Sequence, residues 1–69
     1  MNLEQYRIEC GWSLRRMARE AEIDFTTLKR AMNGENVSGD TAKKLAAAIS
    51  RELRQEIRYT QIEGLHTNL

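Results

Sequence analysis

The spacing of apolar residues between Ser13 and Asn33 constrains the fold of this chain more than any other feature of its sequence. This segment, SLRRMAREAEIDFTTLKRAMN, has helical spacing on both sides of a three-residue connection around Glu22. If residues 14–21 and 25–32 are helices joined by a tight turn, six apolar side chains lie where the helices cross: Met17, Ala18, Ala21, Ile23, Leu28 and Ala31. The small side chain of Ala18 suits the point of closest approach. The spacing therefore predicts two crossed helices within residues 13–33.

Capping residues predict where these and the neighbouring helices begin and end. Asn2 is the expected N-cap of a first helix in residues 2–10, which Gly11 ends in the manner of a C-terminal glycine. Ser13 and Asp24 are the expected N-caps of the two crossed helices. A fourth helix is expected after Ser38, with an apolar face of Ala42, Leu45, Ala46 and Ile49.

The apolar pattern of the fourth helix continues through Leu53 and Ile57. Residues 39–59 therefore form either one long helix or two, and a break at Ser50 is slightly favoured because serine is a common N-cap. We expect an all-α fold, a compact bundle of four to five helices, over residues 1–59. Residues 60–69 are expected to be a loosely ordered C-terminal tail.

Composition limits the classes of protein to which such a bundle can belong. The 69-residue chain has no proline, four glycines and one cysteine, a composition that favours helix. It has no apolar run long enough for a membrane span and no N-terminal signal pattern, so we expect a cytoplasmic protein. Eleven basic and ten acidic residues nearly cancel, which argues against a protein that coats nucleic acid without sequence preference.

The sequence contains no pattern typical of an enzyme. It has no nucleophile–base pair, no paired carboxylates and no glycine-rich phosphate loop. The single cysteine, Cys10, and the single histidine, His66, have no neighbouring ligand residues, so we expect no metal site and no cofactor.

The chain resembles the phage repressor and Cro-like helix-turn-helix proteins, the Xre family, over about residues 3–49. The resemblance is carried by Tyr6-Arg7, Gly11-Trp12-Ser13, Met17-Ala18, Ile23, Leu28, Asn33-Gly34, Leu45-Ala46 and Ile49. It implies that the third helix enters the major groove of double-stranded DNA. It also implies a homodimer on a palindromic operator in the nucleoid, where a repressor or Cro-like switch of phage or bacterial type would block polymerase by occlusion.

The resemblance also implies a role for individual residues. The base-reading positions would be Phe25, Thr26, Lys29 and Arg30, and the phosphate contacts would come from Arg15, Arg16, Thr27, Asn33 and Lys43. Arginine can donate two hydrogen bonds to guanine, and threonine or phenylalanine can contact a thymine methyl group. Leu53 and Ile57 are the candidate dimer interface, with closure of the chain's own core under the first helix as the alternative.

The sequence departs from the family pattern at three positions. Leu14 stands where glutamine is common, and leucine cannot bond a phosphate. Glu22 stands where glycine is common, at a turn that requires positive φ. Phe25 is large and apolar at the start of the third helix. Leu14 and Phe25 together suggest an alternative function, in which this surface of the bundle binds another protein, as in an antirepressor or an antitoxin-like module.

Overall fold

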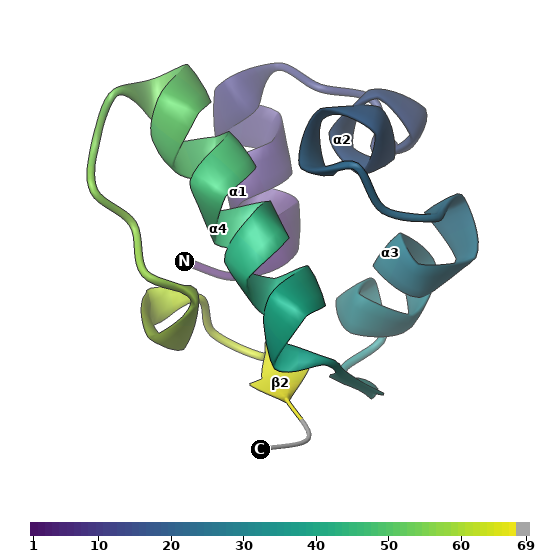
Figure 1. The fold of residues 1–69 in the computed structure, drawn as a ribbon. Coiled ribbons are helices and arrows are strands. Elements are labelled where there is room, and N and C mark those ends of the chain that lie inside the picture. Colours follow the sequence, from purple (N-terminus) through teal and green to yellow (C-terminus); the bar gives the residue numbers. More distant parts are fainter. Residues whose placement is uncertain (68–69) are drawn as a thin grey trace.

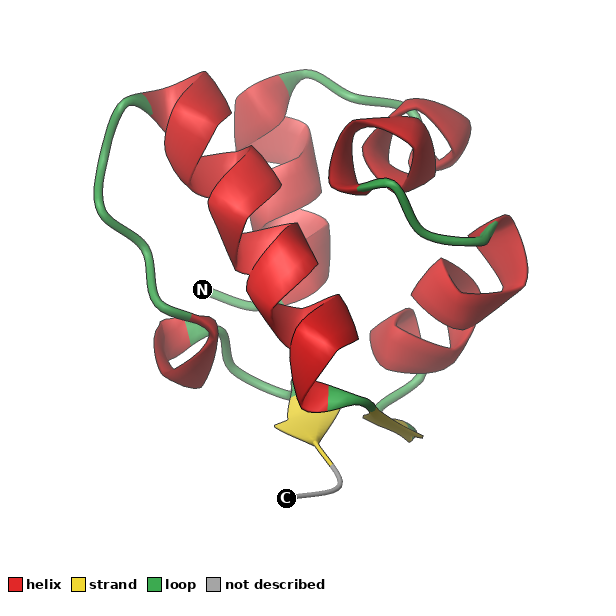
Figure 2. Cartoon of the chain, in the orientation of Figure 1, coloured by secondary structure: helices red, strands yellow, loops and turns green. Residues whose placement is uncertain are grey.

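The computed structural model describes residues 1–67 and consists mainly of four α-helices (Figures 1 and 2). The helices are α1 (Leu3–Cys10), α2 (Leu14–Ala21), α3 (Phe25–Met32) and α4 (Gly39–Leu53). The strand β1 (Asn36–Val37) lies between α3 and α4, and the 3₁₀ turn η1 (Tyr59–Gln61) and the strand β2 (His66–Thr67) follow α4. The expected helical bundle is confirmed, with the addition of a small two-stranded sheet.

The capping residues act as expected at three of the four helix starts. The side chains of Asn2, Ser13 and Ser38 each accept a hydrogen bond from a backbone N–H in the first turn of their helix. Asp24 lies at the N-cap position of α3, but its side chain makes no capping hydrogen bond. The predicted bounds of α2 and α3 agree with the structure.

The core lies between α4 and the other three helices. Helix α4 packs against α1 and α2, and α2 packs against α3, so α4 lies across the bundle in Figure 1. The four largest fully buried side chains are Met17, Leu28, Leu45 and Ile49. The alanines expected where α2 and α3 cross (Ala18, Ala21 and Ala31) are buried, and Ile23 packs against the same core.

The expected helix break at Ser50 is wrong, because α4 continues through this residue to Leu53. The Ser50 hydroxyl donates to the Ala46 carbonyl oxygen at 2.7 Å, one turn earlier, and so adds a bond inside the helix. It also accepts the backbone N–H of Ile57 at 3.0 Å. Helix α4 ends where Arg54 adopts the left-handed conformation. The hydrogen bond between Ser50 and Ile57 then holds the following segment against the last turn of α4.

The segment expected as a loose tail from residue 60 is ordered as far as residue 67. Ile62 is 3% exposed and belongs to the core. Asn36 and Val37 pair in parallel with His66 and Thr67, and Asn2 forms an isolated bridge with Glu63. Hydrophobic burial and strand pairing hold the segment against both α1 and the α3–α4 connection. Residues 68 and 69 of the expected tail lie outside the described part of the chain.

The apolar residues expected at a dimer interface are used within the chain itself. Ile57 is 8% exposed and belongs to the core cluster, and Leu53 is half-buried against the same cluster. Ile57 therefore helps to close the chain's own core, which was the alternative interpretation. The Ile57 side chain offers little surface to a second copy.

Candidate functional site

The outer face of α3 presents a row of polar and basic side chains. Thr26, Lys29, Arg30 and Asn33 are all exposed, and their spacing (i, i+3, i+4, i+7) places them on one side of the helix. Leu28 and Ala31 lie on the opposite side and are buried. Burial of these two residues fixes the rotation of α3 and thereby exposes the row.

Four cations on α2 and α3 lack acidic partners. Among residues 1–67, the side chains of Arg15, Arg19, Lys29 and Arg30 form no ion pair. Arg16 differs, since its Nε lies 3.7 Å from Glu20 Oε2 one turn further along α2. The α2–α3 face therefore carries positive charge that its own acids do not neutralise, despite the near-neutral charge of the whole chain.

Phe25 is covered by two of these cations. The Arg15 guanidinium carbon lies 4.7 Å from the centre of the Phe25 ring, and Lys29 Nζ lies 5.6 Å from it. Both distances are within the range of cation–π attraction. The ring is half-buried, as is Leu14, which packs against the core.

The apolar spot expected from Leu14 and Phe25 is consequently not an open hydrophobic patch. The large apolar side chains that are exposed in residues 1–67 are instead Met1 and Ile8, and Ile8 is 62% exposed. The surface that the protein-binding alternative requires is thus largely covered.

The expected phosphate contacts are only partly brought together. Arg15 and Arg16 are exposed on α2, Asn33 is exposed at the end of α3, and Thr27 is half-buried. Lys43 lines an open groove between α4 and residues 57–60, beside Arg58 and Tyr59. The structure therefore groups Lys43 with η1 and not with the row on α3.

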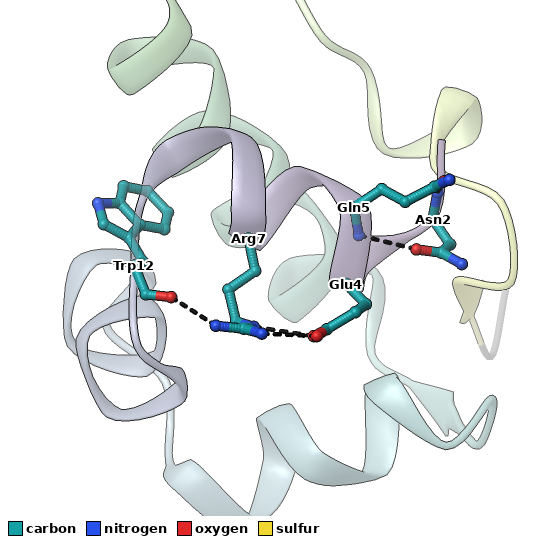
Figure 3. A network of polar contacts seen from close by, with 5 residues as sticks. All are labelled: Asn2, Glu4, Gln5, Arg7 and Trp12. Carbon is teal, nitrogen blue, oxygen red and sulfur yellow. Dashed lines mark hydrogen bonds and ion pairs between the residues drawn. The ribbon is translucent and has the colours of Figure 1, made fainter.

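Arg7 braces the junction between α1 and α2 (Figure 3). It donates to the Trp12 carbonyl oxygen at 2.7 Å and through Nε to Glu4 Oε1 at 2.8 Å. The hydrogen bond from Arg7 lowers the pKa of Glu4, and Glu4 raises the pKa of Arg7 in turn. The spacing of Glu4 and Arg7 is visible in the sequence, whereas the contact with Trp12 depends on the turn.

Arg51 fastens the other end of α2 and was not identified from the sequence. Its guanidinium donates to the Glu20 backbone carbonyl at 3.2 Å, in the last turn of α2. Carbonyl groups at a helix C-terminus lack partners within the helix and attract cations. No local signal could have revealed this contact, because 31 residues separate the two positions.

The other chemically reactive groups are separate from this face. Cys10 is buried, and burial together with the nearby Glu52 and Glu9 raises the pKa of its thiol. Within residues 1–67, no three acidic, cysteine or histidine side chains are grouped as metal binding requires. In the same residues, no helix has the length and apolar character needed to cross a membrane.

Comparison with known families gives a match over most of the chain. The sequence model of a helix-turn-helix family, HTH_3, matches residues 3–55. This range contains all four helices. No significant match is found among curated proteins or among solved structures.

Proposed function

The chain belongs to the helix-turn-helix family HTH_3, whose members are DNA-binding transcription regulators, and we propose that it is a sequence-specific repressor or Cro-like switch of phage or bacterial type. It would bind an operator in double-stranded DNA and block polymerase by occlusion. The observation that carries this proposal is the exposed row on α3, flanked by cations that form no ion pair with any acid among residues 1–67.

In this proposal α3 lies in the major groove, with Thr26, Lys29 and Arg30 toward the base edges. Arg30 would donate two hydrogen bonds to a guanine, a contact worth about 1–3 kcal/mol of discrimination between bases. Phe25, the fourth residue expected there, would lie at the edge of this row. Contacts from Arg15, Arg16, Thr27 and Asn33 to phosphates would set the position of the helix without reading sequence.

A homodimer on two half-sites is part of the proposal, since one small reading head makes few base contacts. Light scattering of the protein with and without an operator duplex measures this directly. A single protomer per palindromic duplex at saturation would refute the dimer and leave the reading head intact.

The test of the function is a titration of duplex DNA from the gene's own upstream region, followed by fluorescence anisotropy at several salt concentrations. Sequence-preferring binding that weakens steeply with salt is expected, because phosphate contacts release counterions. A folded protein that binds none of these duplexes at low salt would refute the proposal. It would favour the protein-binding alternative.

A pair of double variants locates the interface. Replacing Lys29 and Arg30 by alanine should weaken binding by roughly tenfold or more, as expected for the loss of base contacts. The matched control replaces Lys43 and Arg58 by alanine, which removes the same two residue types from the groove beside η1. If the control loses as much affinity, the DNA-binding face has been assigned to the wrong side of α4.

A further inference from the structure

The Phe25 ring lies where α2 and α3 meet at the surface, and it contacts one cation from each helix. Arg15 is the second residue of α2, and Lys29 is one turn along α3 from Phe25. Their charged groups lie 4.7 Å and 5.6 Å from the ring centre. Neither cation has an acidic partner among residues 1–67, so the ring is the attractive group that the structure gives to both.

We propose that Phe25 is a positioning residue that holds Arg15 and Lys29 ready for contact with DNA, and that it does not itself read a base. The proposal rests on the proposed function. It differs from the role that the family resemblance gives to Phe25, which is direct contact with a base.

Two physical reasons support a positioning role. Arginine and lysine have long, flexible side chains, and ordering them is a cost that binding would otherwise carry. The face of an aromatic ring attracts cations, so the ring confines both side chains before DNA arrives. It also offsets part of the repulsion between two like charges that are held close together in the free protein.

The half-burial of Phe25 fits this role. Phe25 is half-buried at the first position of α3, and both cations lie over its ring. Phenylalanine has fewer side-chain torsions than arginine or lysine, so a half-buried ring can define where the longer cationic side chains rest. The two helices that carry the cations are themselves fixed by buried residues on each, Met17 on α2 and Leu28 on α3.

The first measurement is made on the free protein and does not depend on DNA. The ring current of Phe25 should shift the NMR signals of the Arg15 Hδ and Lys29 Hε protons upfield. Phe25→Leu keeps an apolar side chain without a ring and should abolish these shifts, whereas Phe25→Tyr should retain them. The absence of such shifts in the wild-type protein would overturn the proposal.

The second measurement is the affinity for the duplex selected in the titration above. Phe25→Leu should weaken binding roughly two- to fivefold, as expected for the loss of an exposed cation–π contact, and Phe25→Tyr should restore it. In an Arg15→Ala background, Phe25→Leu should cost less than it does in the wild type, because one of the two cations is already gone. Thermal unfolding verifies that each variant is folded, and Arg15→Ala removes only an exposed side chain.

The possible results separate this inference from the proposed function. If the wild type binds a duplex but Phe25→Leu binds equally well, the positioning role is refuted and the function stands. An equal loss with and without Arg15, or a loss that Phe25→Tyr does not restore, also refutes it and indicates direct contact between Phe25 and DNA. If the wild type binds no duplex, the function is refuted and this role falls with it.

Discussion

Replacement of Glu22 by glycine should stabilise the protein, because Glu22 has a backbone conformation that is unfavourable for residues other than glycine. Its φ of 57° lies in the left-handed region, as does the 72° of Gly11. The two helix ends have the same hydrogen bonds. The Ile23 N–H donates to the Ala18 carbonyl at the end of α2, and the Trp12 N–H donates to the Arg7 carbonyl at the end of α1. The same type of helix ending is thus made with glycine after α1 and with glutamate after α2.

The size of the effect follows from two opposing terms. Relief of the left-handed conformation should contribute about 1–2 kcal/mol. Glycine loses more backbone entropy on folding than other residues do, which offsets roughly 0.5–1 kcal/mol of that gain. The net gain in the free energy of unfolding is about 0.5–1 kcal/mol, which raises the Tm of a domain of this size by roughly 2–8 °C.

The assay is thermal unfolding followed by circular dichroism, with three comparison variants. Glu22→Gln removes the negative charge at the C-terminus of α2 and keeps the side chain, so the difference between E22G and E22Q isolates the backbone effect. Arg54→Gly repeats the experiment at the other non-glycine position with positive φ, 54°. Glu56→Gly is the negative control, since Glu56 is exposed and has no positive φ.

The expected order of Tm is E22G above E22Q, and R54G above wild type, with E56G at or below wild type. A Tm for E22G equal to or below that of E22Q would refute the strain at Glu22. An equal rise in E56G would indicate that glycine acts through some general effect and not through φ.

Two further predictions concern the hydrogen bond between Ser50 and Ile57 and the ion pair between Glu4 and Arg7. Ser50→Ala should lower the free energy of unfolding by about 1–2 kcal/mol in chemical denaturation, because it leaves the Ile57 N–H without its partner. Thr60→Ala, at an exposed position, is the control. Equal stability of S50A and the wild type would contradict a contribution from this hydrogen bond. Because Arg7 lowers the pKa of Glu4 below its usual 4.5, the charged carboxylate stabilises the fold above that pH, and this contribution is lost as the pH falls through the lowered pKa. Glu4→Gln should therefore have a lower Tm than wild type at neutral pH and the same Tm in strong acid, and a difference that stays constant across this range would refute the linkage.

Much of the fold was predictable because it depends on short-range patterns. Helical spacing and caps depend on residues three to four positions apart, and they predicted α2 and α3 with the observed bounds. The exposed row on α3 follows from the same spacing, since burial of Leu28 and Ala31 leaves one side of the helix outside. The positive φ at Glu22 followed from the resemblance, because the family has glycine there, and the structure has this conformation.

The remaining features depend on contacts that no local pattern contains. The sequence pattern around a serine is compatible with an N-cap and with a position inside a helix. Ser50 lies inside α4, and its hydrogen bond with the Ile57 N–H forms only because the chain returns after the helix. The polar C-terminal segment by itself predicts a loose tail. His66 and Thr67 form a strand because they pair with β1, which is distant in the sequence. Periodicity identifies which residues need burial and does not identify which segment will cover them.

The same division holds at the candidate site. The sequence by itself determined which residues α3 exposes, because helical periodicity assigns each side chain to a face. Tertiary structure decided the surroundings of those residues: Arg15 of α2 over the Phe25 ring, Arg51 at the end of α2, and Lys43 in a different groove. The physical reason is that cation–π contacts and carbonyl capping require groups on different helices to come within a few ångströms. Only packing of the core sets those distances.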